Sequence, residues 1–355
     1  MNKAFLVFPL IIFSLLLAVW SGWIRVGWDL PLAKMSWQHG AIMVNSFLAS
    51  LIFLERAVTF RNKAVLLLPF VNALSAVAFI SGYNMAGQSL LIAGSLGFLV
   101  MCLYFVYRYK ELYYYVFVAG AACLLTGNII LLKTQLYPAA VTWWMGFLLF
   151  TIVAERLELS RFLSLTKRKT GFLLAALASV LITVCWPFHL YGQILFALAI
   201  AATAIWLLRY DMAWHSIRIK GQHRYSGILL ITGYFWLLIT SALMITADRF
   251  AFGYDATLHS FFIGFVFSMI FSHAPIILPA VAKLPVKIYR PVLYVWFVFL
   301  QLSLIIRVIA DIITDPVCRR IGGIANGFTI LLFFVTVALI VRKELQKRKA
   351  SVRKA

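Results

Sequence analysis

The chain has 355 residues, of which 64% are hydrophobic and 12% are charged. Because soluble domains carry about 25% charged residues, this composition excludes an ordinary soluble domain. The net charge of +21 suggests nucleic acid at first sight. However, the basic residues lie between apolar runs and at the C-terminus, where they set membrane topology. We therefore expect a lipid bilayer, and no nucleic acid, as the partner.

Apolar runs recur along the chain and predict an all-α, polytopic membrane protein with twelve transmembrane helices. The strands of a membrane β-barrel would alternate apolar and polar residues, and these runs do not. The predicted spans are 4–24, 39–55, 64–82, 88–107, 112–132, 137–154, 170–188, 191–208, 225–246, 258–280, 291–312 and 322–341. They form a single domain, 1–341, followed by a basic, frayed cytoplasmic tail, 342–355.

Basic residues are distributed unevenly between the loops. The loops that follow even-numbered spans hold seventeen Lys and Arg residues, whereas the loops that follow odd-numbered spans hold six. The positive-inside rule therefore predicts that both termini and the even-numbered loops are cytoplasmic.

A weak internal repeat relates three of the predicted spans. Span two ends in Leu54-Glu55-Arg56-Ala57, and span six ends in Ala154-Glu155-Arg156-Leu157, one hundred residues later. If span ten is placed in the same frame, His259 falls opposite His39. This pattern indicates three four-helix units in which spans two, six and ten are equivalent. We interpret both Glu-Arg pairs as anchors at the cytoplasmic ends of helices.

His39 and His259 each begin a predicted span that runs from the outside to the inside. An ionisable group at the end of a span is costly unless it has a partner or a function. A haem iron can take two axial imidazoles, one from each of two rigid helices, and two helices of one bundle can supply them. The alternative is that each histidine bonds a carbonyl group or a lipid headgroup in the interface.

The segment His39-Gly40-Ala41-Ile42-Met43 resembles the His-Gly-x-x-Met of the second span of haem-copper oxidase subunit I. The whole chain also resembles the NnrS family of twelve-span membrane proteins. The resemblance implies three four-helix arcs and a haem b near the outer face on His39 and His259. It further implies a bacterial-type inner membrane, a nitric oxide response or haem-linked redox chemistry, and an electron donor or small gaseous ligand as a partner.

The chain departs from the oxidases where they hold copper. Span six reads Val141-Thr142-Trp143-Trp144-Met145-Gly146-Phe147 and has no histidine, and span seven offers only His189 at its outer end. We therefore do not expect a binuclear oxygen-reducing site or bound copper.

Three arginines are candidates for binding haem propionates, because a guanidinium group suits a carboxylate. Arg307 lies near the outer end of span eleven. Arg319 and Arg320 lie in the predicted outer loop that follows, and the resemblance implies the same role for them by position. The alternatives are a pair between Arg307 and Asp311 on one helix face, and a solvated loop for Arg319 and Arg320.

His273 lies fourteen residues after His259, about 21 Å deeper along a straight helix, so the two cannot share a ligand. It is a candidate for a second metal site or a proton relay. The alternative is a structural histidine bonded to a carbonyl group that is freed near Pro279.

Two other classes of function stay open. In a transporter or permease without a cofactor, the histidines would line a substrate path. A haem-free membrane assembly or sensor protein is the third class. No P-loop, dinucleotide fingerprint or zinc-protease motif is present. No paired carboxylates occur within a span, which argues against an ion-coupled pump.

Overall fold

The computed structural model describes residues 7–160, 166–186, 192–282 and 285–354, and within these ranges the regular structure is helical, without strands. In that part of the chain, eleven helices are long and apolar enough to cross a membrane. A further helix of 17 residues, α8 (Lys167–Thr183), takes the place of the predicted seventh span. The prediction of an all-α, multi-pass membrane protein is confirmed. Parts of three predicted spans lie outside the described ranges. They are residues 4–6 of the first span and the ends of spans seven and eight at their shared loop, which contains His189.

The helices of the first half are α1 (Phe8–Arg25), η2 (Ala33–Gln38), α2 (His39–Ala41), η3 (Ile42–Ala49), α3 (Ser50–Ala57), η4 (Lys63–Leu66), α4 (Leu67–Ile80), α5 (Asn84–Tyr109), α6 (Leu112–Thr134) and α7 (Tyr137–Ser160). Those of the second half are α8, α9 (Gln193–Tyr210), α10 (Ala213–Arg218), α11 (Gln222–Thr246), η7 (Ala247–Arg249), α12 (Gly253–His259), η8 (Ser260–Phe267), α13 (Ser268–Ala282), α14 (Leu293–Ile313) and α15 (Pro316–Lys354).

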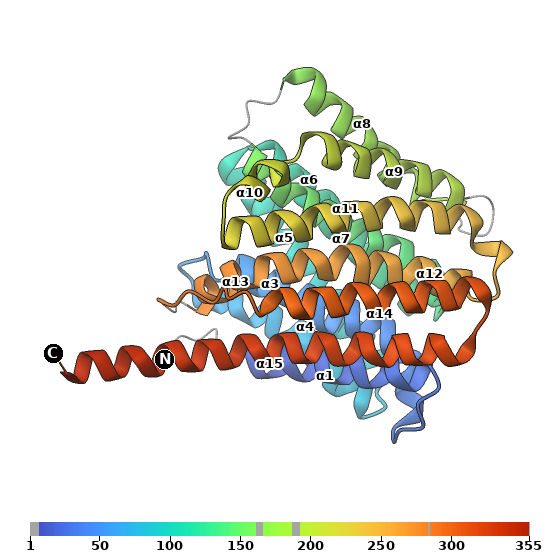
Figure 1. Cartoon of the computed structure of the whole chain (residues 1–355). Coiled ribbons are helices and arrows are strands. Elements are labelled where there is room, and N and C mark those ends of the chain that lie inside the picture. The colour runs from blue at the N-terminus through green and yellow to red at the C-terminus, as the bar shows by residue number, and fades with distance from the viewer. Residues whose placement is uncertain (1–6, 161–165, 187–191, 283–284, 355) are drawn as a thin grey trace.

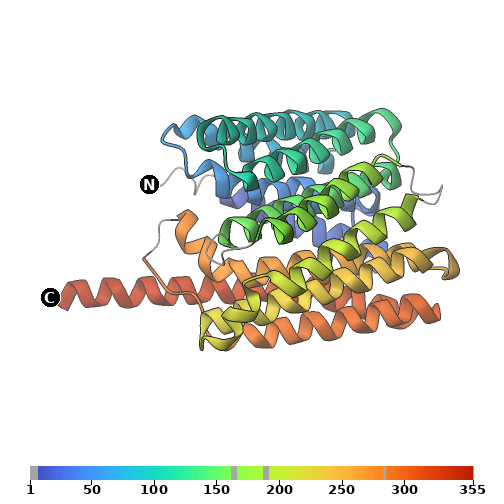
Figure 2. The same cartoon turned by 90° about the horizontal axis from the view of Figure 1, so that it is seen from above.

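Consecutive spans pack side by side, and α15 returns to pack against α1, which closes the bundle (Figures 1 and 2). Three spans lie at its centre. Span two (η2 to α3) is 67% buried, span six (α7) is 78% buried, and span ten (α12 to α13) is 67% buried, more than any other span among the described residues. Spans two and ten also touch directly, through α3 and α13. This arrangement agrees with the repeat, in which the same three spans are equivalent.

Both histidine-bearing spans contain a π-helix. In span two it covers Ile42–Ala49, and in span ten it covers Ser260–Phe267. Each segment follows its histidine within three residues. A π-helical turn is wider than an α-helical turn, is rare, and is found mostly at functional sites. The feature therefore marks spans two and ten as a matched pair.

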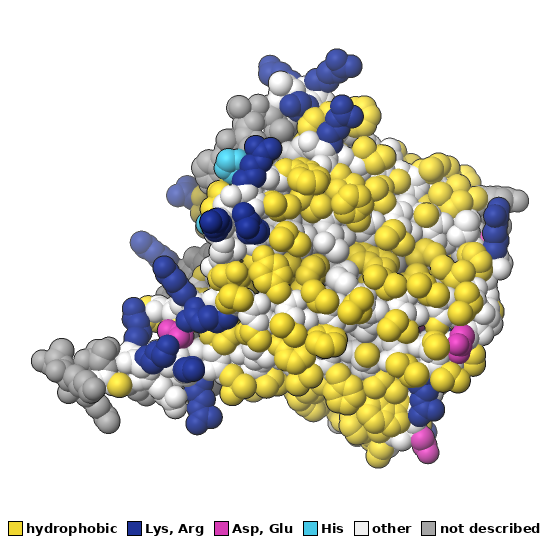
Figure 3. All heavy atoms as spheres, in the orientation of Figure 1, with side chains coloured by type: hydrophobic (Ala, Val, Ile, Leu, Met, Phe, Trp, Pro, Cys, Tyr) yellow, Lys and Arg dark blue, Asp and Glu magenta, His cyan; other side chains and the backbone are white. Residues whose placement is uncertain are grey.

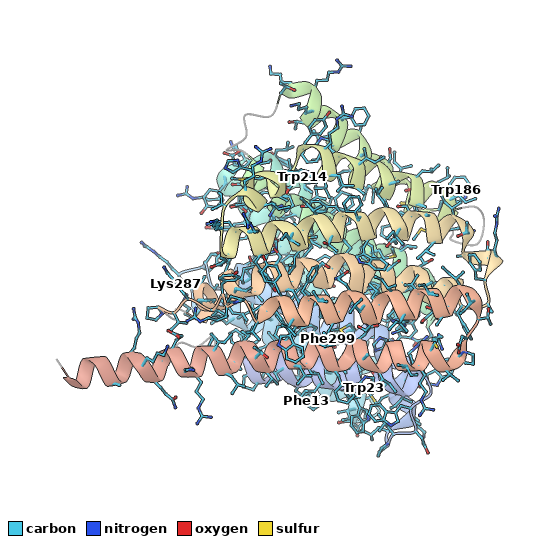
Figure 4. All side chains as sticks on the ribbon, viewed as in Figure 1. Phe13, Trp23, Trp186, Trp214, Lys287 and Phe299 are labelled. Atoms are coloured by element: carbon cyan, nitrogen blue, oxygen red, sulfur yellow. The ribbon has the colours of Figure 1, made fainter. Side chains whose placement is uncertain are left out.

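The surface fits a bilayer. Apolar side chains cover the middle of the bundle, while Lys and Arg gather at the end where the C-terminus projects (Figure 3). In Figure 4, Lys287 lies toward this basic end, whereas Trp23 and Trp186 lie toward the opposite end. Phe299 lies between them on the face of α14 and is 54% exposed. A large apolar side chain that is exposed at mid-height is expected where lipid, not water, surrounds the helices.

The last helix differs from the prediction. It begins at Pro316 and continues without a break through Arg342 to Lys354, so the expected frayed tail is helical (Figure 1). Its start is capped by Asp315, whose Oδ1 accepts hydrogen bonds from the backbone N–H groups of Val317 and Cys318 at 2.9 and 3.1 Å. The hydrogen bond from Cys318 has the larger effect in lowering the pKa of Asp315, and the bond from Val317 lowers it further. An acidic cap followed by Pro is a helix start.

Candidate functional site

A cavity of about 470 Å³ opens between spans two, six and ten at the end of the bundle opposite the C-terminus; we call it the outer cavity. This volume lies within the range of about 300–1,000 Å³ that is typical of small-molecule and cofactor sites. Most of its lining is apolar. Its polar and charged lining residues are Arg25, Gln38, His39, Gln135, Tyr137, Tyr254, Asp255, His259, Arg307 and Asn326. The structure therefore brings His39 and His259 to one cavity, as the sequence predicted.

The imidazole of His39 is held by α1. Its Nδ1 lies 2.9 Å from the carbonyl oxygen of Ala18 and 3.4 Å from Oγ of Ser21. Because a carbonyl oxygen only accepts, Nδ1 carries the proton and donates it. No described residue forms a hydrogen bond with Nε2. The lone pair of His39 Nε2 is therefore available.

His259 is fixed in the same way, within its own helix. Its Nδ1 donates to the carbonyl oxygen of Asp255 at 2.9 Å, and a carboxylate oxygen of Asp255 lies 3.3 Å from the same nitrogen. Nε2 again has no hydrogen-bond partner among the described residues. Metal-ligating histidines almost always donate their other ring N–H to a carbonyl or carboxylate group, which sets the tautomer and the ring orientation. Both histidines show this arrangement.

Asp255 also joins three helices through ion pairs. One of its oxygens, Oδ2, accepts from Arg307 Nη2 at 2.9 Å and from Nε at 3.2 Å, and lies 3.2 Å from Arg319 Nη2. Arg319 Nε lies 2.9 Å from Asp311, at an angle that does not make a hydrogen bond. Two aspartates thus balance two arginines beside His259. Such a balanced buried cluster can hold a helix end rigidly.

The three predicted propionate-binding arginines therefore have different surroundings. Arg307 lines the outer cavity, but it pairs with Asp255 across helices and not with Asp311. Arg319 is engaged by both aspartates. Arg320 is exposed, and both Arg319 and Arg320 lie in the first turns of α15 instead of in a loop.

Arg25, at the end of α1, was not among the predicted site residues. It lines the outer cavity, is exposed, and forms no ion pair with any described acidic residue.

A known protein family covers nearly the whole chain. A family model described as a domain of unknown function, DUF8744, matches residues 4–342. The chain belongs to the DUF8744 family. No curated protein and no solved structure matches it.

In this DUF8744 chain, His273 lies at a different cavity near the basic end of the bundle. Its Nδ1 donates to the carbonyl oxygen of Met269 at 2.9 Å, and its Nε2 faces Nη1 of Arg156 at 3.5 Å. Because Arg156 can only donate, its contact occupies the lone pair that a metal would need. The second metal site stays a prediction, and this contact counts against it. No group of three or more His, Cys, Asp and Glu is placed to hold a metal ion within the described ranges.

Sequence reasoning missed Asp255 although its signal was present. It precedes His259 by four residues, so the two side chains share one helix face. An aspartate four residues before a histidine at a span end is itself a sign of an oriented imidazole. The contacts of Asp255 with Arg307 and Arg319 had no such local signal, because their partners lie on other helices.

Proposed function

We propose that the outer cavity binds a haem b between His39 and His259, and that this DUF8744 member is a membrane haem protein of the type implied by its resemblance to NnrS. The observation that carries the proposal is the matched pair of imidazoles. Each donates Nδ1–H to a backbone carbonyl oxygen, and each leaves Nε2 without a hydrogen-bond partner among the described residues, in one cavity of about 470 Å³. This is the arrangement expected of metal-ligating histidines.

The rest of the lining fits the same group. Apolar side chains such as Val44, Phe262 and Ile330 suit a macrocycle. Arg25 and Arg307 supply cations for propionates, and Arg25 is the one that no described carboxylate engages. The proposed propionate site therefore keeps Arg307 and takes Arg25 in place of Arg319 and Arg320.

A bound haem would supply one-electron chemistry or a site for a gaseous ligand such as nitric oxide. The role of this chain's residues is to bind and orient the group. Ala18 and Asp255 fix the two rings, and the pairing of Asp255 with Arg307 and Arg319 fixes the helix that carries His259. If His39 and His259 both held the haem, a gaseous ligand could bind only after one of the two histidines had let go.

The test is an absorption spectrum of the protein purified with adequate haem supply. The expected result is a Soret band that is weakened or shifted in His39→Ala and in His259→Ala. His273→Ala is the matched control, because it lies at the other cavity and should leave the band unchanged. A well-folded protein that takes up no haem, even on reconstitution, overturns the proposal.

A transporter is the second candidate, and one observation favours it. A smaller cavity lies between the same three spans, further along them, and both π-helices contribute lining residues to each cavity. In span two, Val44 lines the outer cavity and Leu48 lines the inner one, one turn further along. Two cavities separated by a thin apolar barrier are typical of alternating access. Single cysteines at Met43 and Leu51, in a cysteine-free background, should then label reciprocally when a transported solute is added.

A further inference from the structure

The smaller cavity, which we call the inner cavity, has a volume of about 90 Å³. Its polar lining is limited to Glu55 of span two, Thr151 and Glu155 of span six, and His273 of span ten. By the same measure of volume, one water molecule needs about 10–15 Å³, so the cavity has room for several. The sequence showed no paired carboxylates within one span. The structure pairs them from two different spans.

Charge at the inner cavity is unbalanced among the described residues. Arg56 Nη2 lies 2.8 Å from Glu155 and 3.7 Å from Glu55, and Nη1 lies 3.7 Å from Glu158. Its other side stacks over the ring of Phe117, with the guanidinium carbon 4.4 Å from the centroid. One guanidinium group thus faces three carboxylates.

The neighbouring arginine does not restore the balance. Arg156 Nε and Nη2 donate to the two oxygens of Asp211 at 2.9 and 3.1 Å, and the two side chains are 4% and 1% exposed. Its remaining Nη1 faces His273. Arg156 and Asp211 therefore form a closed pair. The other titratable groups near Arg56 and Glu158 are Cys102 of α5 and Tyr113 and Tyr114 of α6.

Thr151 gives an independent sign of a small ligand. It lines the inner cavity, is 1% exposed, and its Oγ1 has no hydrogen-bond partner in the described part of the chain. A buried hydroxyl group that has no hydrogen-bond partner is unfavourable. Water in the cavity would supply the missing partner.

We propose that the inner cavity is a proton-binding site, in which Glu55 and Glu155 share one exchangeable proton beside water that is hydrogen-bonded to Thr151. The proton comes from a hydronium ion, which becomes water as one carboxylate becomes a carboxylic acid. Two carboxylates that share one site in an apolar setting cannot both ionise freely, so one retains a proton. Arg56 balances the other. Glu158, whose side chain is 32% exposed, is the most accessible of the three.

The test is pH-difference infrared spectroscopy of the full chain in lipid nanodiscs. At neutral pH we expect a C=O stretch of a carboxylic acid that shifts in D2O and disappears at alkaline pH. Glu55→Gln and Glu155→Gln should each abolish it, since the one glutamate left at the cavity then pairs with Arg56, while Glu158 lies outside the cavity lining and is partly exposed. Glu158→Gln is the matched control and should keep the band, because Glu55 and Glu155 still share one cation. Thr151→Val should shift its frequency.

Two results would overturn the proposal. A band that survives in both Glu55→Gln and Glu155→Gln belongs to another group. A wild-type protein without a titrating band holds no such proton, and this reading does not depend on whether a variant folds. If that protein were also stabilised by Na⁺ but not by choline, the inner cavity would be a cation site instead.

Discussion

Gly22 of α1 lies directly against the imidazole of His39, so that a Cβ atom at position 22 would stand 2.8 Å from Cε1 and 3.1 Å from Nδ1. Only a residue without a side chain allows this approach. The same His39 ring donates its Nδ1–H to the carbonyl oxygen of Ala18. Gly22 therefore decides where His39 Nε2 points within the outer cavity.

We predict that Gly22→Val displaces the His39 ring from Ala18 and weakens haem binding by about 10–100-fold, the usual effect of losing a group that orients a metal ligand. Haem titration followed at the Soret band measures the change. Gly171→Ala on α8 is the matched control, because a Cβ atom there meets nothing within 4 Å. Equal haem affinity in Gly22→Val and the unmodified protein would show that this close approach does not orient the ligand.

We predict that the ion pairs of Asp255 stabilise the end of the bundle that holds the outer cavity. Asp255→Asn removes the negative partner that Arg307 and Arg319 share and leaves Asp311 as the one carboxylate beside these two largely buried cations. Removing one partner of a buried ion pair costs about 3–5 kcal/mol, and we expect a loss in that range. The measurement is the free energy of unfolding in detergent. Asp29→Asn, at an exposed position, should change it little; a similarly small loss in Asp255→Asn would contradict the assignment.

The orientation of the chain can be tested at two loops that α7 separates. Lys133 lies near the end of α6 and Lys167 at the start of α8. The charge bias predicts Lys133 outside and Lys167 inside. Reporter fusions at the two positions should therefore give opposite readings. The same reading from both would mean that α7 does not cross the membrane, which its 78% burial in the centre of the bundle argues against.

The sequence was informative where a feature repeats or is local. Hydropathy predicted the spans, and the Glu-Arg repeat together with the matched histidines predicted that spans two, six and ten are equivalent. The structure adds that these three spans are the most buried ones among the described residues. The sequence was uninformative about contacts between side chains on different helices. The alternative considered for Arg307 was a pair with Asp311 four residues on, but tertiary packing pairs it with Asp255 instead. Likewise, Arg319 and Arg320 were placed in a loop because the cap at Asp315 was not recognised.

The π-helices could not be predicted either. Ile42–Ala49 and Ser260–Phe267 are apolar, like the α-helical spans, so hydropathy gives no sign of the wider turn. Their positions became meaningful only with the two cavities, because both π-helices line each of them. A repeat in backbone geometry was thus present without a matching repeat in residue type.

The cap at Asp315 gives a prediction for pH. The folded chain lowers the pKa of this carboxyl group, since the ionised form accepts hydrogen bonds from the N–H groups of Cys318 and Val317. A lowered folded pKa means that the stabilisation is present above the ordinary aspartate pKa and is lost as the pH falls through the folded value. We therefore expect the first turn of α15 to fray in acid.

Hydrogen exchange at Val317 and Cys318 measures this fraying, after correction for the intrinsic pH dependence of exchange. Asp315→Asn is the informative variant, because asparagine caps a helix without a titrating charge. Its protection at these two amides should not change with acid, whereas protection in the unmodified protein should fall. A loss of protection that is identical in both proteins would assign the acid sensitivity to another group, and the helix start would then not depend on the charge of Asp315.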